Sequence, residues 1–240
     1  MRISVAIIAH NEEKHIAQCI KSVLSQTRKA DEIILIVHNS TDNTFNIAQS
    51  YPIKVIKFEG ESGPLYAREE AVRNTSGDII ICTDGDTSIE NNWIEVMSDT
   101  LNNNQNILVG SYIKFTGTIF HKLGNIYNKY LCKTKNGSAP AWLWGASFAF
   151  WGKDKDLVLD IFEKVKENDK ELGVKSNTPA EDYWLALYLS EKGNIEVTNK
   201  TYVTASMKEV GICEEIKRNI ENHKRGRAIK KFFNINKKPL

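Results

Sequence analysis

Paired cysteines, long apolar runs and a glycine-rich turn near the N-terminus are all missing from this sequence. Its four cysteines are scattered without paired spacing, which argues against a disulfide framework or a zinc site and favours a reducing compartment. They are Cys19, Cys82, Cys132 and Cys213. The apolar run Ile3–Ala9 is too short and wrongly flanked for a signal peptide, and no stretch approaches the roughly 20 residues that cross a bilayer. We therefore expect a cytoplasmic protein.

The first apolar run is followed by His10-Asn11-Glu12-Glu13, which contains no glycine. A dinucleotide-binding dehydrogenase is expected to carry Gly-x-Gly-x-x-Gly here, and a sugar-phosphate nucleotidyltransferase a glycine-rich turn that holds phosphate. Both classes are therefore disfavoured. The 26% charged and 41% hydrophobic residues are typical of a soluble globular protein. A chain of 240 residues suffices for one large α/β domain, or for a domain with a small appendage.

Short apolar runs alternate with helical patterns over the first hundred residues. Apolar residues recur at helical spacing from Ile16 to Val23, and Asn11 is predicted to cap this helix. Pro64 is predicted to open a later helix. Repeated strand and helix predict a mostly parallel sheet with right-handed crossovers. Beyond Trp93 the alternation is looser. The predicted strands are Ile3–Ala9, Glu32–Val37, Lys54–Phe58, Asp78–Thr83, Ile107–Phe115 and Gly145–Trp151.

The stretch from Asp78 to Asp86 ends a buried strand in two carboxylates, Asp84 and Asp86, separated by one glycine. In open α/β sheets, ligands lie beyond the carboxyl ends of the strands. Two hard oxygen ligands at such a point suit Mg²⁺ or Mn²⁺ carrying a nucleotide diphosphate. The alternative is an ordinary acidic turn, because Asp and Gly are common turn residues.

A second acidic pair, Glu181-Asp182, follows Thr178-Pro179. Proline favours the first turn of a helix, so both carboxylates are predicted to lie in a first turn. Acids in a first turn often do no more than interact with the helix dipole, and that reading stays open beside a catalytic one.

Six sequence elements occur in order along the chain. They are Ser4 to Glu13, Asp31 to Ile34 with Ser40 to Thr44, Gly63 with Ala67-Arg68, Ser76 to Asp86, Gly145-Ala146-Ser147, and Glu181-Asp182. Together they resemble the motifs of family-two glycosyltransferases with the GT-A fold, inverting enzymes that use nucleotide-diphospho-sugars. The resemblance covers roughly Ile3 to Val210.

The resemblance implies an α/β, Rossmann-like sandwich of the GT-A type, with a mostly parallel central sheet and helices on both faces. It places a single domain at residues 1–211, with a nucleotide-sugar-binding half at 1–115 and an acceptor-side half at 116–211. A C-terminal helical tail at 212–240 follows. The implied activity moves a sugar from a nucleotide-diphospho-sugar to a hydroxyl, glycan or lipid-phosphate acceptor.

The resemblance also assigns site residues. Asp86 is expected to bind the metal, Mn²⁺ or Mg²⁺, directly, while Asp84 holds the ribose or a metal-bound water. Asp182, next to Glu181, is the expected general base. Arg68 is expected to pair with the diphosphate, the alternative being a solvent-facing arginine beside Glu69 and Glu70. The full donor-binding set is Ala9, His10, Asn11, Glu12, His38, Asn39, Arg68, Asp84, Asp86 and, through a loose match, Lys208.

Two departures from the family pattern affect the base pocket. His38 or Asn39 stands where the family has a base-contacting Asp, and Ala9-His10 replaces Pro-Tyr. An asparagine can both donate to and accept from a base edge, so the base preference stays open. The missing Asp also favours a second hypothesis, a catalytically degenerate protein that binds a nucleotide or glycan without turnover.

The C-terminal tail is strongly basic. Nine Lys and Arg residues and the single acid Glu221 lie between Lys217 and Lys238, and apolar residues such as Ile216 and Phe233 alternate with them. This pattern predicts a basic amphipathic helix, docked on the domain or attached peripherally to the inner face of an anionic membrane. Nucleic acid is not an expected partner, because the rest of the chain supplies no complementary basic face.

Overall fold

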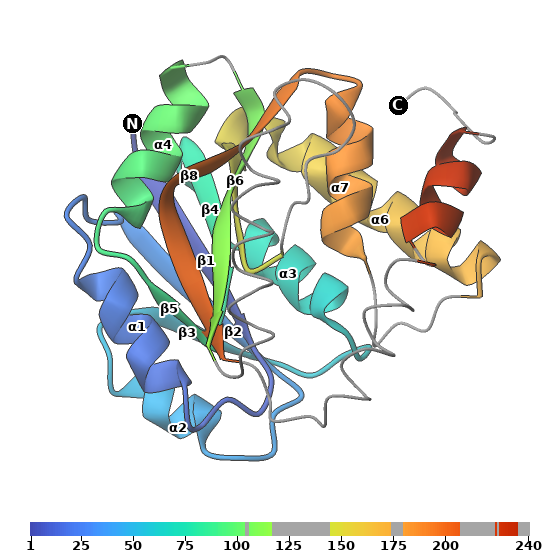
Figure 1. The fold of residues 1–240 in the computed structure, drawn as a ribbon. Helices are drawn as coiled ribbons and strands as arrows, with labels where there is room; N and C mark the ends of the chain where they lie inside the picture. Colours follow the sequence, from blue (N-terminus) through green and yellow to red (C-terminus); the bar gives the residue numbers. More distant parts are fainter. Residues whose placement is uncertain (104–105, 117–144, 174–179, 207–223, 225, 235–240) are drawn as a thin grey trace. The chain divides into compact units, whose positions relative to one another are not determined.

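The computed structural model describes residues 1–103, 106–116, 145–173, 180–206, 224 and 226–234. The chain forms two compact units, Met1–Ser206 and Met207–Leu240. The described part of the first unit is an eight-stranded sheet, in the order β3-β2-β1-β4-β7-β6-β8-β5, with helices on both faces (Figure 1). The predicted α/β class is therefore confirmed.

Four parallel strands form the first half of the sheet: β3 (Lys54–Phe58), β2 (Glu32–His38), β1 (Ile3–Ala9) and β4 (Ile79–Asp84). They come from the predicted apolar runs, and all seven residues of β1 are buried. Their register brings the carboxyl ends to one edge of the sheet, where Ile8 lies opposite Asp84 and Ala9 opposite Val37. The candidate site of Asp84 and Asp86 was predicted at this edge of the sheet.

The second half of the sheet is mixed. Strand β7 (Ser147–Trp151) is antiparallel to both β4 and β6 (Asn106–Thr116). Strand β6 runs parallel to β8 (Asn194–Ser206), and the short β5 (Thr87–Ile89) pairs antiparallel with β8. The reversal at β7 brings its first residue beside the carboxyl end of β4, since Ser147 lies opposite Thr83.

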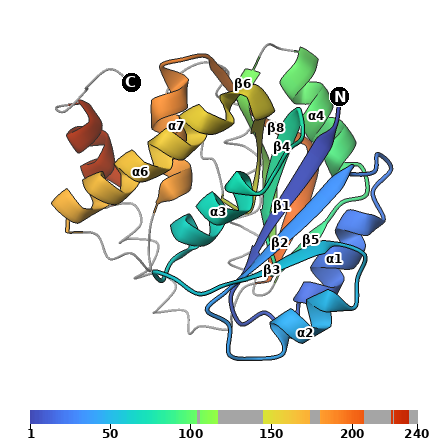
Figure 2. The same ribbon diagram turned by 180° about the vertical axis from the view of Figure 1, so that it is seen from behind.

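Helices cover both faces of this sheet (Figures 1 and 2). One face carries α1 (Ile16–Leu24) and α4 (Trp93–Asn103), whose buried residues join the core with Val5, Ile7 and Ile81. The short α2 (Thr44–Gln49) packs against α1 and β3. The other face carries α3 (Pro64–Arg73), which contacts β1, β2 and α6 (Lys155–Glu171). Helix α6, which follows the short 3-10 helix η1 (Gly152–Asp154), packs in turn on α7 (Glu181–Ser190).

The predicted N-cap role of Asn11 is wrong. Helix α1 begins at Ile16, four residues later than that cap requires, and Asn11 has a positive φ of 55°. Its side-chain oxygen accepts a hydrogen bond from the backbone N–H of Thr41, at 2.8 Å. Asn11 therefore joins the loop after β1 to the loop after β2, because its amide is used between loops instead of at a helix end.

Two predicted helix starts, at Pro64 and at Glu181-Asp182, are confirmed. Pro64 is the first residue of α3, and Glu181 and Asp182 lie in the first turn of α7.

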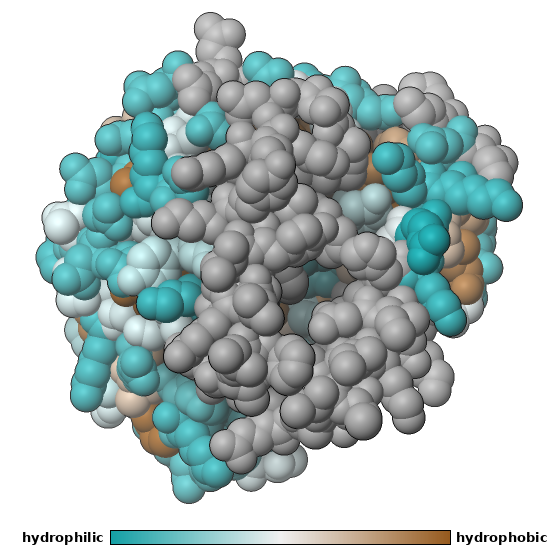
Figure 3. All heavy atoms as spheres, in the orientation of Figure 1, coloured by the Kyte–Doolittle hydropathy of each residue, from teal (hydrophilic) through white to brown (hydrophobic). Residues whose placement is uncertain are grey.

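In Figure 3 the described residues of one face are mainly hydrophilic, and Met1 is the one exposed large hydrophobic residue among those described. Among the described residues, no helix has both the length and the apolar character needed to cross a bilayer.

In the second unit, the described residues 224 and 226–234 are helical. The predicted boundary at 211/212 lies outside the described residues, as do Lys208 and Ile216 of the predicted amphipathic pattern. The domain division and the tail's membrane contact therefore stay predictions.

Candidate active site

The turn Asp84-Gly85-Asp86 leaves the end of β4 and lies tightly against β1. The backbone N–H of Gly85 donates to the carbonyl of Ile8 at 2.8 Å. A Cβ at Gly85 would lie 3.1 Å from the Ile8 carbonyl oxygen and 2.8 Å from the Cβ of Ala9, and the second distance is shorter than real Cβ contacts. Glycine is therefore required here for a close approach, and it lets the two carboxylates flank a turn pressed onto the sheet edge.

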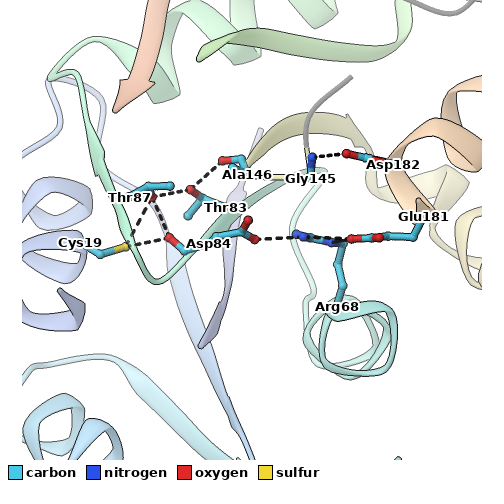
Figure 4. Close-up of polar contacts among 9 residues, drawn as sticks. All are labelled: Cys19, Arg68, Thr83, Asp84, Thr87, Gly145, Ala146, Glu181 and Asp182. Carbon is cyan, nitrogen blue, oxygen red and sulfur yellow. Dashed lines mark hydrogen bonds and ion pairs between the residues drawn. The ribbon is translucent and has the colours of Figure 1, made fainter. Parts of the chain in front are cut away.

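A buried network of small polar side chains holds this turn (Figure 4). The Thr87 hydroxyl donates to the Asp84 carbonyl at 2.7 Å and lies 3.0 Å from the Thr83 hydroxyl, which donates to the Ala146 carbonyl at 2.9 Å. The Cys19 thiol donates to the Asp84 carbonyl at 3.4 Å. The network ties the turn to α1 on one side and to the start of β7 on the other, and local sequence patterns gave no signal for it.

Asp86 lies in a negatively charged environment. Burial, and then the charges of Asp84 and Glu12, raise the pKa of its carboxyl to about 7, while His15 acts weakly in the opposite direction. Glu12 is itself only 8% exposed and is 3.0 Å from His15. No Lys or Arg forms an ion pair with Asp86 in the part of the chain that the structure describes. The turn therefore has an excess of negative charge that a bound cation would neutralise.

The described residues contain no group of three or more His, Cys, Asp or Glu side chains arranged to hold a metal by themselves. The two carboxylates of Asp84 and Asp86 suit Mg²⁺ or Mn²⁺, which proteins commonly bind through one or two carboxylates together with substrate phosphates. Asp86 would be the better placed direct ligand, because Asp84 already accepts a hydrogen bond from Arg68 at 2.9 Å.

Arg68 lies buried between two carboxylates (Figure 4). Its side chain is 2% exposed, which excludes the alternative of a solvent-facing arginine. Nη2 donates to Asp84, and Nε and Nη2 both donate to Glu181 Oε1 at 3.3 Å. Burial acts to lower the pKa of the guanidinium, but the charges of Asp84 and Glu181 raise it above its usual range. Arg68 is therefore always charged, and it joins the end of β4 to the start of α7.

Asp182 is positioned by backbone groups. Its Oδ2 accepts from the N–H of Gly145 at 2.9 Å, and its Oδ1 from the N–H of Tyr183 at 2.7 Å. Burial raises the pKa of Asp182, against the lowering effect of these two N–H groups. Burial also raises the pKa of Glu181 to about 7, against the charge of Arg68 and with a contribution from Asp182. A carboxylate with a raised pKa is a better proton acceptor near neutral pH.

The residues predicted for the base pocket meet where β1 and β2 end. His10 Nδ1 lies 2.8 Å from the His38 carbonyl oxygen. Asn39, with a positive φ of 47°, pairs its side-chain amide with both backbone groups of Gly60, at 2.9 and 3.2 Å. The Asn39 amide is therefore occupied by the chain itself.

His38 is 3% exposed, and its ring centroid lies 5.3 Å from that of Phe58. Burial lowers the pKa of its imidazole, against a hydrogen bond that the ring donates to the Glu61 backbone, so the ring is neutral at pH 7. Its Nε2 is a buried atom without a hydrogen-bond partner among the described residues. A buried polar atom is normally satisfied, so His38 has capacity for a ligand.

Gly145 was expected only as part of the Gly145-Ala146-Ser147 element, and its place beside Arg68 and Glu181 was not predicted. A Cβ there would lie 2.8 Å from Arg68 Nη2 and 3.3 Å from Glu181 Oε1. A short sequence motif does not reveal that a glycine is needed beside residues far away in the chain.

The model of one family, Glycosyl transferase family 2, matches residues 4–162, most of the sheet and the Asp84-Gly85-Asp86 turn. The chain belongs to this family. Among similar proteins, it is 29% identical over 135 residues to glycosyltransferase GlyA of Streptococcus pneumoniae, covering 52% of this chain and 19% of GlyA. It is 28% identical over 120 residues to the dolichol-phosphate mannosyltransferase of Pyrococcus furiosus, covering 48% of this chain and 34% of that protein.

Solved structures agree with the family at the level of the fold. The structure of S. aureus TarS 1-349 in complex with UDP matches with a TM-score of 0.63 at 17% identity. The match covers 87% of this chain and 61% of that one. The chain thus covers 19%, 34% and 61% of the three proteins named here, less than two thirds of each.

Proposed function

We propose that this family 2 protein is a metal-dependent inverting glycosyltransferase that moves a sugar from a nucleotide-diphospho-sugar to a hydroxyl, glycan or lipid-phosphate acceptor. The observation that carries the proposal is the uncompensated negative charge at Asp86, whose pKa is raised to about 7 by burial, Asp84 and Glu12. It lies at the carboxyl edge of parallel strands, where α/β sheets bind nucleotides.

The donor base would lie over the ends of β1 and β2. His38 supplies a neutral imidazole whose Nε2 has no hydrogen-bond partner among the described residues and can accept or donate according to its tautomer. The ribose and diphosphate would extend from there toward the Asp84-Gly85-Asp86 turn. The base preference then depends on His38, because the Asn39 amide is already paired with Gly60.

A bound Mg²⁺ or Mn²⁺ would act as a Lewis acid, held by Asp86 and offsetting the charge that develops on the diphosphate. The residues of the chain supply the proton transfer. Asp182, with a raised pKa, accepts the proton of the acceptor hydroxyl as that oxygen attacks the anomeric carbon from the face opposite the diphosphate. Attack from the opposite face inverts the configuration at that carbon. A positioned general base typically contributes about 10²–10⁴-fold.

A lipid-linked acceptor is supported by the name of the Pyrococcus furiosus relative and by the basic pattern of the C-terminal tail. Peripheral attachment to an anionic membrane would bring such an acceptor to the site, with each cation near the surface contributing about 1 kcal/mol.

Calorimetry with a panel of nucleoside diphosphates, with Mn²⁺ or with chelator, tests the donor site. We expect one base to bind much more tightly with the metal present, and Asp86→Asn to lose that gain. Equal affinity with and without metal would refute the metal assignment. Nucleotide-sugar turnover is then measured with the preferred base. Tight donor binding without turnover on any acceptor class would support the degenerate binding protein instead.

A further inference from the structure

Arg68 lies where the donor side and the acceptor side of the site meet. It projects from α3, and its single guanidinium contacts Asp84 at the end of β4 and Glu181 in the first turn of α7, which are 97 positions apart in the chain. Asp84 begins the turn that carries Asp86, and Glu181 is adjacent to Asp182. The buried Arg68 side chain therefore contacts Asp84, two positions before the proposed metal ligand Asp86, and Glu181, next to the proposed base Asp182.

The surroundings keep this guanidinium in place. The Phe148 ring lies under it, with Arg68 Cζ 5.4 Å from the ring centroid. Gly145 leaves room for it, because a Cβ there would come within 2.8 Å of Nη2. Gly145 also donates its N–H to Asp182 Oδ2. The space for the Arg68–Glu181 pair and the placement of Asp182 thus depend on the same short segment.

We propose that Arg68 is a positioning residue that couples the donor turn to the proposed base, by holding Asp84 and Glu181 with one guanidinium so that Asp182 is correctly placed relative to the bound donor. This inference rests on the proposed function. Lysine cannot take over the role, because its ammonium is a single point charge whereas the guanidinium is a planar fork that serves both carboxylates.

A simpler role would make Arg68 a donor ligand alone. Its Nη1 is buried without a hydrogen-bond partner among the described residues, so it could bind a phosphate or ribose oxygen. The two roles differ in what they predict. Loss of a donor ligand weakens donor binding only, whereas loss of the junction also lowers turnover when the donor is saturating.

Four variants separate these roles: Arg68→Gln, Arg68→Lys, Glu181→Gln and Gly145→Ala. Arg73→Gln is the matched control, because Arg73 is on the same helix but is half exposed, and its partner Glu69 keeps a second ion pair with Lys166. Donor affinity is measured by calorimetry with the preferred nucleoside diphosphate and Mn²⁺, and kcat at saturating donor. Thermal melts followed by circular dichroism check that each variant is folded.

We expect Arg68→Gln to weaken donor binding and to lower kcat by about 10²-fold, the usual effect of misplacing reacting groups by about 1 Å. Arg68→Lys does not restore kcat. Glu181→Gln lowers kcat but leaves donor affinity within about threefold, because its contact is on the α7 side of the junction. Gly145→Ala lowers kcat although it removes no charge, and Arg73→Gln changes neither quantity.

The double variant Arg68→Gln/Glu181→Gln should have a kcat within about threefold of the slower single variant, since both changes remove one shared junction. If the double variant loses kcat by the product of the two single-variant factors, the coupling is overturned. It is also overturned if Arg68→Gln has the same kcat as the Arg73→Gln control. If Arg68→Gln does not fold, an unchanged kcat in Gly145→Ala overturns it. A native protein that turns over no nucleotide-sugar would refute the proposed function, and this inference with it.

Discussion

Replacing Asp86 by Asn tests the charge imbalance from which the donor site was inferred. The carboxyl is part-buried, and burial, Asp84 and Glu12 raise its pKa from 3.8 to about 7. Because the folded-state pKa lies above the ordinary value, the fold favours the protonated carboxyl. The contribution of the Asp86 carboxyl to the free energy of unfolding is therefore complete below pH 3.8, and it is lost as the pH rises through about 7.

The size of the loss follows from the pKa difference. At about 1.4 kcal/mol per pKa unit, a fully buried carboxyl with this pKa would lower the free energy of unfolding by about 4 kcal/mol at pH 8. Asp86 is only part-buried, so screening by water reduces the expected loss to about 2 kcal/mol. Asparagine keeps the shape without the charge. Asp86→Asn should therefore be about 2 kcal/mol more stable than the native protein at pH 8, with about a third of that gain at pH 5.

Urea denaturation of both proteins in chelator, at pH 8 and pH 5, measures the two differences. Asp99→Asn is the matched control, because Asp99 is 61% exposed and 4.0 Å from Arg28, so its replacement should change the free energy of unfolding by less than about 0.5 kcal/mol. Added Mn²⁺ with the preferred nucleoside diphosphate should stabilise the native protein far more than the variant. A variant less stable than the native protein at pH 8 in chelator would refute the reasoning, since the carboxylate would then be compensated within the fold.

Three further predictions concern other parts of the molecule. Asp182→Asn should lower turnover by about 10²–10⁴-fold and leave donor affinity within a few-fold; loss of donor binding instead would move Asp182 to the donor side. Gly85→Ala should lower the free energy of unfolding by about 1–3 kcal/mol in urea denaturation, because its Cβ would lie 2.8 Å from that of Ala9; unchanged stability would show that the turn can move away from β1. The full chain, but not one ending near Gly211, should sediment with anionic vesicles at low salt and dissociate at high salt; if neither form sediments, the tail has no membrane role.

The parallel half of the fold was predictable because its signals are local. A short apolar run indicates a buried strand whatever its neighbours are, and the runs at Ile3–Ala9 and Asp78–Thr83 became β1 and most of β4. Pro64 and Thr178-Pro179 correctly indicated helix starts, since proline restricts the backbone at its own position. With the rule that ligands bind at the carboxyl ends of strands, this was enough to place Asp84 and Asp86 at one edge.

The sequence by itself therefore determined the fold class and the position of the acidic turn, and the ordered motifs indicated the family. Only the tertiary structure decided that Arg68 is buried between Asp84 and Glu181, that Gly145 must lack a side chain, and that Asn11 bridges two loops instead of capping a helix. These contacts join residues about 16 to 113 positions apart. Spacing along a helix or strand carries no information about them, because they depend on which strands and helices pack side by side.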